Sequence, residues 1–190
     1  MNFNTHSNLI GKHAFLSASN YHWVNYDEEK LRNTYLKYRA AEHGTELHDF
    51  AAQAIRLGIK LTANHNTLNM YVNDAIRFHM TPEQPLFYSY NAFGTADSIC
   101  YNNKTKTLRI HDLKTGETKA SFLQLEIYAA LFCLEYHMNP EDLELIELRI
   151  YQFNDVAVEE ANPNDIREIM NIIVNFDEII DRMEMGGMYE

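Results

Sequence analysis

Residues 94–128 read GTADSICYNNKTKTLRIHDLKTGETKASFLQLEIY, and this stretch decides the fold. Residues 86–101 are rich in aromatic and β-branched side chains, and a turn cluster at 102–104 separates them from a second extended run at 107–113. Residues 122–136 then carry apolar side chains at helical spacing. The stretch therefore predicts a β-hairpin followed by a helix.

Charged residues of the predicted hairpin point to a metal site. Asp112 and Lys114 are two residues apart on one strand, so they share a face at about 6–7 Å along the strand, and Asp97 on the neighbouring strand can join them. Two carboxylates beside an ammonium are costly unless a divalent cation neutralises them, and oxygen ligands suit Mg²⁺ or Mn²⁺. Such an ion activates water for attack on phosphorus, with Lys114 orienting that water or stabilising the developing charge. The alternative is a solvated ion pair at the end of a strand.

Three short motifs follow one another here: Gly94-x-x-Asp97, Asp112-x-Lys114 and Gln124-x-x-x-Tyr128. Their order resembles the PD-(D/E)XK nuclease superfamily, in particular its RecB-like and phage-type exonuclease branch. The resemblance implies a restriction-endonuclease-like core of the mixed α/β class, with a small mixed sheet flanked by helices. It also implies that Asp97 and Asp112 are metal ligands, that the carbonyl of Leu113 is a further ligand, and that Lys114 is the catalytic lysine.

The helix after the hairpin carries the third motif. Gln124 and Tyr128 are four residues apart and therefore share one face of that helix. By the same resemblance, these two residues are expected to act in catalysis, either by orienting the Asp-x-Lys strand or by contacting the DNA backbone near the scissile phosphate.

An upstream histidine extends the resemblance. Residues 41–48 read AEHGTELH, which is similar to the Gly-x-x-x-His element of RecB-like nucleases and implies that His48 binds the metal. Two alternatives stay open. His48 could be a surface residue of an amphipathic helix whose core face is formed by Leu47, Ala51, Ala54 and Ile55. It could also belong to an unrelated histidine-based metal site with His43, although five residues is a poor offset for one helical face.

A single domain is expected over residues 1–190, because 190 residues suffice for one well-packed core. Within it we expect a helical N-terminal part at 1–80, a catalytic sheet core at 86–154 and a C-terminal helix at 163–185.

Local signals refine this organisation. Acidic residues at 27–29 favour a helix start, Gly44 predicts a break in that helix, and a second helix is expected to end near Gly58. A further helix is expected at 68–79, and residues 143–153 read as the last strand. The predicted order is helices, three strands, helix, strand and helix.

Composition limits the compartment and the cofactors. Hydrophobic residues make up 46% of the chain, with no apolar run long enough for a membrane span and no signal-peptide pattern. We therefore expect a cytoplasmic protein of a bacterium or a phage-infected host, with no membrane partner. Some RecB-like nucleases hold an iron–sulfur cluster through four cysteines, whereas this chain has only Cys100 and Cys133, so no such cluster is expected.

The charge distribution bears on partners. The formal net charge is −11, which is unusual for a protein that contacts DNA phosphates. Residues 1–138 hold 13 acidic and 13 basic residues, while residues 139–190 hold 14 acidic and 3 basic residues. The acidic C-terminal region could be a solvated face or a docking side for a recombination or replication protein, and a homo-oligomer is also compatible with the sequence.

Taken together, the motifs predict a Mg²⁺- or Mn²⁺-dependent deoxyribonuclease. Linear DNA or single-stranded ends are the expected substrate, and an exonuclease of phage or bacterial recombination, repair or defence is the expected role. The alternative is a catalytically silent protein of the same fold that acts as a nucleic-acid-binding or regulatory partner.

Overall fold

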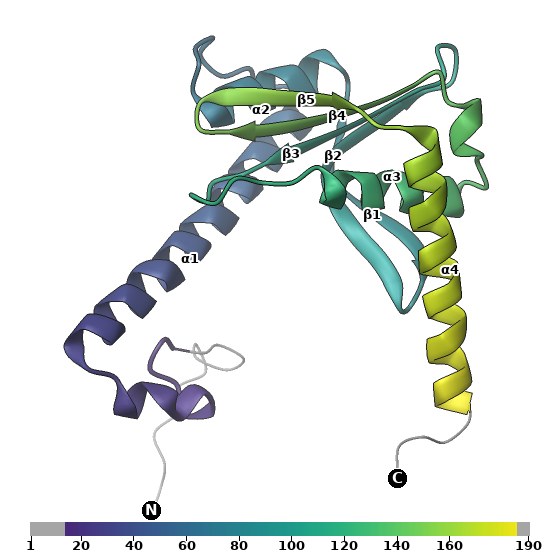
Figure 1. Ribbon diagram of the computed structural model, residues 1–190. Coiled ribbons are helices and arrows are strands. Elements are labelled where there is room, and N and C mark those ends of the chain that lie inside the picture. The colour runs from purple at the N-terminus through teal and green to yellow at the C-terminus, as the bar shows by residue number, and fades with distance from the viewer. Residues whose placement is uncertain (1–13, 186–190) are drawn as a thin grey trace, which may run out of the picture. The chain divides into compact units, whose positions relative to one another are not determined.

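The computed structural model describes residues 14–185 of the chain (Figure 1). Its elements are η2 (Ala18–Asn25), α1 (Glu28–Leu57), α2 (Thr67–Arg77), β1 (Thr81–Ser89), β2 (Ala92–Asn102), β3 (Thr107–Leu113), α3 (Leu123–Glu135), η3 (Pro140–Asp142), β4 (Leu145–Gln152), β5 (Asp155–Glu160) and α4 (Pro163–Met185). No helix among these residues combines the length and the apolar character that crossing a membrane requires.

The chain divides into two compact units, whose described parts are residues 14–45 and 46–185. The first unit holds the 3₁₀ helix η2 and the first half of α1. Asp27 begins α1 by accepting a hydrogen bond from the backbone N–H of Lys30 at 2.7 Å, as an N-cap residue does. The ring of Phe15 packs against Tyr35 and Tyr38, with ring centroids 5.1 and 5.3 Å apart.

The second unit is built on one five-stranded sheet with the order β1-β2-β3-β4-β5. Strands β3 and β4 are parallel and every other neighbouring pair is antiparallel. The parallel pair needs a crossover, which α3 supplies, and α2 and α3 cover opposite faces of the sheet (Figure 1). The mixed α/β class predicted from the sequence is confirmed.

Each face of the sheet has its own apolar core. On one face, Leu108, Ile110 and Leu148 of the central strands are fully buried against α3. On the other face, Tyr71 and Val72 of α2 pack with residues of the last turns of α1 and with the end of β3. The ends of β3 and β4 therefore lie between two packed layers, which fixes the residues that follow them.

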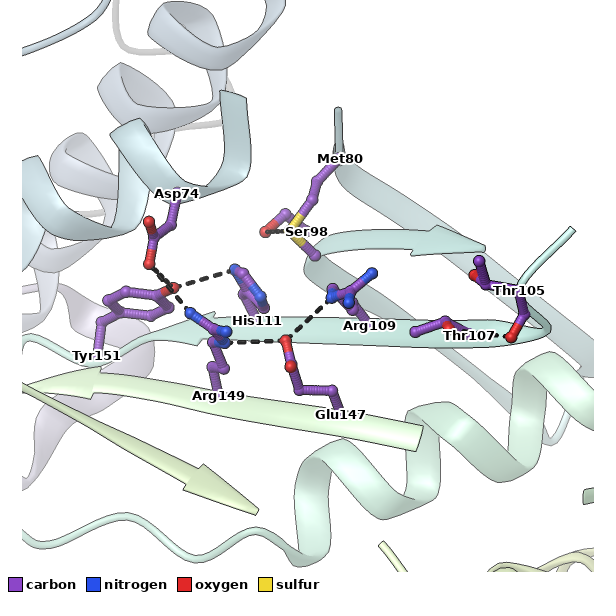
Figure 2. Close-up of polar contacts among 10 residues, drawn as sticks. All are labelled: Asp74, Met80, Ser98, Thr105, Thr107, Arg109, His111, Glu147, Arg149 and Tyr151. Carbon is purple, nitrogen blue, oxygen red and sulfur yellow. Dashed lines mark hydrogen bonds and ion pairs between the residues drawn. The ribbon is translucent and has the colours of Figure 1, made fainter. Parts of the chain in front are cut away.

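A charged network also fastens α2 to the sheet (Figure 2). Asp74 of α2 accepts a hydrogen bond from the Tyr151 hydroxyl at 2.9 Å and pairs with Arg149 at 3.2 Å. Glu147 lies between Arg149 and Arg109, at 2.9 and 3.0 Å. Because these residues are mostly shielded from water and paired, they fix the position of α2 on the sheet more firmly than exposed ion pairs would.

The network includes a buried histidine. His111 of β3 is fully buried, and its Nδ1 lies 3.3 Å from the Tyr151 hydroxyl. Burial, together with the positive charges of Arg149 and Arg109, lowers the pKa of His111 to about 3. His111 is therefore neutral at physiological pH. Its ring fills space in the core and contacts the Tyr151 hydroxyl.

The structure corrects three expectations. Helix α1 runs without interruption through Gly44, so the predicted break is wrong; a glycine inside a helix costs only about 1 kcal/mol, which a helix of this length tolerates. The run at 86–101, predicted as one extended segment, contains a turn at Tyr90 and Asn91 and belongs to two paired strands, β1 and β2; the three strands predicted before the crossover helix are thus β1, β2 and β3. The sequence interpretation also missed β5, whose residues are mostly exposed and show no clear apolar alternation.

The packing of β4 gives a stability prediction. Leu148→Ala should lower the free energy of unfolding by about 2–5 kcal/mol, because the side chain is fully buried in the core under α3 and its removal leaves a cavity. Val158→Ala is the control, since Val158 on β5 is 57% exposed and should change stability by less than about 0.5 kcal/mol. Urea unfolding of both variants measures the difference, and similar costs would contradict the described core.

Candidate metal centre

Strand β1 places an acidic residue opposite Asp97. The residues on both sides of this position pair across β1 and β2 in regular antiparallel register, so Glu83 lies directly across from Asp97. Glu83 has a φ of 50°, in the left-handed region that residues with a Cβ atom adopt rarely. Such backbone conformations occur often where a side chain must be aimed at a functional site.

Helix α1 adds a histidine to these two carboxylates. His48 lies in the part of α1 that belongs to the second unit, and its Nδ1 is 3.4 Å from Asp97 Oδ2. One potential ligand atom from each of His48, Glu83 and Asp97 lies within 4.8 Å of the other two. The histidine nitrogen and two carboxylate oxygens form a donor set that suits a divalent cation such as Mn²⁺.

The acid–base properties of the group reflect crowding of negative charge. The hydrogen bond with Asp97 raises the pKa of His48, against the opposing effect of burial. Burial raises the pKa of Glu83, and the negative charge of Asp97 raises it further. The group therefore attracts positive charge, either a proton on His48 or a cation.

Asp112 lies near the end of β3, within electrostatic reach of Asp97 and His48. Its side chain is only 2% exposed, and burial followed by the charge of Asp97 raises its pKa from 3.8 to about 6. The Lys114 ammonium is 3.1 Å from Oδ1 as an ion pair, yet neither carboxylate oxygen has a hydrogen-bond partner of acceptable geometry among the described residues. A buried carboxylate without donors is costly, so the site fits a cation that would complete the coordination of this oxygen-rich cluster.

A backbone contact ties the end of β3 to Asp97. The N–H of Leu113 donates a hydrogen bond to Asp97 Oδ2 at 2.8 Å, the same oxygen that faces His48. The backbone N–H of Lys114 in turn bonds the carbonyl of Tyr151 on β4 at 2.9 Å. The positions of the two aspartates are therefore set by main-chain contacts of three adjacent strands.

Lys114 is held from the other side by α3. Its Nζ donates to Gln124 Oε1 at 2.8 Å, and Gln124 Nε2 donates to the Tyr128 hydroxyl at 3.0 Å. The side chains of Asp112, Lys114, Gln124 and Tyr128 thus form one continuous chain of polar contacts. This chain restricts the flexible lysine side chain to one position beside the acidic cluster.

Gly94 of β2 allows Tyr128 of α3 to pack closely against this strand. A Cβ atom at this position would lie 3.0 Å from Cε1 of Tyr128, which is closer than a side chain tolerates without movement of the ring. Glycine at the first position of the Gly94-x-x-Asp97 motif therefore has a steric reason here, namely the approach of α3 to β2.

Hydrogen bonds and ion pairs connect His48 with Asp97, Asp97 with Leu113, and Asp112 with Lys114, Gln124 and Tyr128. The tightest group consists of His48, Glu83 and Asp97, and Asp112 does not belong to it, although it lies within electrostatic reach. Leu113 contributes its N–H to this arrangement, and its carbonyl as a metal ligand stays a prediction.

Glu83 was missed by the sequence interpretation. The available signal was an acidic residue between two prolines, Pro82 and Pro85, at the start of the first strand. Locating it opposite Asp97 requires the register of the β1–β2 hairpin, which depends on recognising the turn at Tyr90 and Asn91.

Comparison with known proteins finds no relative of this chain. No family model, no curated protein and no solved structure matches this chain.

Burial of Asp112 gives a pH-dependent prediction. Because folding raises its pKa from 3.8 to about 6, the native state binds a proton more tightly, and Asp112 destabilises the metal-free protein as pH rises through this window. Asp112→Asn removes the effect. The free energy of unfolding of the variant minus that of wild type should therefore increase by up to about 3 kcal/mol from about pH 4 to about pH 7.5.

Urea unfolding in EDTA at both pH values measures this gain. Glu144→Gln, which removes an exposed carboxylate, is the control and should show a small and nearly constant difference. An equally constant difference for Asp112→Asn would contradict the burial of its charge.

Proposed function

We propose that this protein is a Mg²⁺- or Mn²⁺-dependent nuclease that hydrolyses phosphodiester bonds of DNA, acting from an end, with the core arrangement of the PD-(D/E)XK superfamily. The observation that carries the proposal is the surroundings of Asp112. Its buried carboxylate has no hydrogen-bond partner of acceptable geometry among residues 14–185, pairs with the Lys114 ammonium and lies within electrostatic reach of Asp97 and His48. A structural ion pair at a strand end would not need two further acidic residues and a histidine beside it.

His48, Glu83 and Asp97 would hold the ion, with Asp112 as an additional carboxylate. A divalent ion bound there supplies Lewis-acid polarisation of a phosphoryl oxygen and activation of water. Hard oxygen ligands accept Mg²⁺, and the imidazole of His48 makes Mn²⁺ the more comfortable partner.

Lys114 supplies the positive charge that the reaction needs beside the ion. Its ammonium can orient the attacking water or stabilise the negative charge that develops on the phosphoryl oxygens. The hydrogen bond from Lys114 to Gln124 fixes the ammonium in place, so little reorganisation is needed during the reaction. Gln124 and Tyr128 are therefore positioning residues in this scheme, and contact with the DNA backbone is the further role proposed for them.

The biological setting belongs to the proposal as well. We place the activity in the cytoplasm of a bacterium or phage-infected host, in DNA recombination, repair or defence. The exposed acidic residues of the region 139–190 would repel DNA and leave the surface that they occupy for a protein partner.

A second candidate function is a nuclease-fold protein that binds nucleic acid or regulates a partner without cleaving. The net charge of −11 favours it, because phosphate contacts usually draw on lysine and arginine. The presence of Asp97, Asp112 and Lys114 in one polar cluster favours the nuclease.

Cleavage of end-labelled linear DNA and covalently closed circular DNA tests the nuclease. Wild type should degrade the linear DNA only, with Mn²⁺ or Mg²⁺ and not with EDTA. Lys114→Ala should slow this reaction by about 100-fold or more, because a preorganised charge beside the reacting phosphate is lost. Lys60→Ala, which removes an exposed lysine of the α1–α2 loop, should cleave at the wild-type rate. Equal rates for the two variants would contradict the role of Lys114.

Metal titration of the same cleavage reaction tests the ligand set. Glu83→Gln and His48→Ala should each raise the Mn²⁺ concentration needed for half-maximal activity by about tenfold or more, because groups that only orient ligands already change metal affinity by 10–100-fold. His48→Ala should in addition lose more activity at limiting Mn²⁺ than at saturating Mn²⁺. Glu144→Gln serves as the carboxylate control, and unchanged titrations for both site variants would reduce Glu83 and His48 to structural residues.

A further inference from the structure

A groove of about 520 Å³ begins at Lys114 and runs between β2 and α3. Its polar end is formed by Lys114, Gln124 and Tyr128, the chain of contacts described above. Its other walls are apolar, with Phe93 on β2 and two side chains of α3, Leu123 and Ile127. The groove therefore shares Lys114 with the candidate metal centre. The groove is mostly apolar, whereas the metal centre is charged.

The apolar walls are unusually exposed. Phe93 is 66% exposed, Leu123 54% and Ile127 38%. Phe93 pairs across the hairpin with Phe87, whose ring lies 5.5 Å from that of Tyr90, so the end of the β1–β2 hairpin presents several aromatic rings to solvent. Exposed apolar surface gathered around a concave site commonly marks a binding site.

The groove has a polar end at Lys114 and apolar walls, and a nucleotide has the same division between its phosphate and its base. A phosphate at the metal centre would lie beside Lys114, and the base of that nucleotide would extend toward Phe93 and the apolar side chains of α3. A base has a flat apolar face that stacks on aromatic rings, and such stacking contributes about 1–3 kcal/mol per base.

The charge of the protein favours such a contact. Phosphate contacts by lysine and arginine supply most of the affinity of ordinary DNA-binding proteins, but this chain carries a net charge of −11. Contacts other than phosphate contacts then gain weight, and base stacking is the sequence-independent contact that this groove offers.

We propose that the groove between Phe93 and α3 binds an unpaired nucleobase, so that the substrate is a single strand or a frayed end and not an intact duplex. The inference rests on the proposed nuclease function for the position of the phosphate. A base inside a duplex is stacked on both faces and paired at its edge, and releasing it costs a few kcal/mol. An end or a single strand avoids this cost, which gives the groove a role in substrate choice.

Binding is measured with the full-length Asp112→Asn protein in Mg²⁺, in which cleavage is suppressed. Fluorescence anisotropy follows a labelled single-stranded DNA oligonucleotide and the same oligonucleotide annealed to its complement with blunt ends. Adding Phe93→Ala should weaken binding of the single strand by about 5- to 160-fold and change duplex binding by less than about twofold. Phe93→Trp should restore single-strand binding, because a larger ring also stacks.

Tyr136→Ala is the matched control, because Tyr136 is an aromatic residue, 53% exposed, at the other end of α3. It should leave single-strand binding unchanged. A set of oligonucleotides with one abasic nucleotide at successive positions locates the bound base. At one position, the abasic nucleotide should weaken binding to the Asp112→Asn parent as much as adding Phe93→Ala does. The same abasic nucleotide should not weaken binding further when Phe93→Ala is already present.

The outcomes separate this inference from the nuclease proposal. If wild type cleaves DNA with metal but Phe93→Ala binds the single strand as tightly as its parent, the groove inference is wrong and the nuclease proposal stands. If wild type cleaves nothing but single-strand binding depends on Phe93 and on one base, the groove inference stands and the nuclease proposal fails. Absence of single-strand binding, or occupation of the groove by a second copy of the chain, would also overturn the inference.

Discussion

The buried carboxylate of Asp112, placed close to the negative charge of Asp97, is the constraint around which this end of the sheet is organised. Burial and the nearby carboxylate both raise its pKa, so the folded chain must bring positive charge to it. Lys114 does so from the position just after the end of β3, at 3.1 Å. The Leu113 N–H fixes Asp97, and Gln124 of α3 fixes Lys114, so the charges are held by the sheet and by the crossover helix.

This arrangement gives the crossover helix two tasks. Its buried face completes one core of the sheet, while its first turns reach the strand ends with Gln124 and Tyr128. Gly94 permits the close approach, because a side chain there would collide with the Tyr128 ring. On the opposite face, the Asp74 and Arg149 network anchors α2, and the shared core of α1 and α2 supports the helix that carries His48. The same packing that stabilises the fold thus determines the geometry of the site.

Local sequence patterns were sufficient for the parts of the site that depend on short-range geometry. The two-residue period of a strand predicts that Asp112 and Lys114 share a face, and the four-residue spacing of a helix does the same for Gln124 and Tyr128. Glu83 was beyond such patterns, because its position opposite Asp97 depends on hairpin register and on an unusual φ. Strand β5 was also missed, since it pairs at the sheet edge with mostly exposed side chains. The predicted break at Gly44 failed because the packing and length of α1 outweigh the small helix penalty of one glycine.

In our account the carboxylates of Glu83 near the start of β1, Asp97 in the middle of β2 and Asp112 near the end of β3 form a site for a divalent cation. Calorimetric titration of the metal-free protein with Mn²⁺ at neutral pH tests it without any assumption about substrate. We expect saturable binding by wild type that is lost or strongly weakened in Asp97→Asn, while the unfolding temperature without metal shows that the variant is folded. Equal Mn²⁺ binding by wild type and by the folded variant, or no binding by either, would contradict the account.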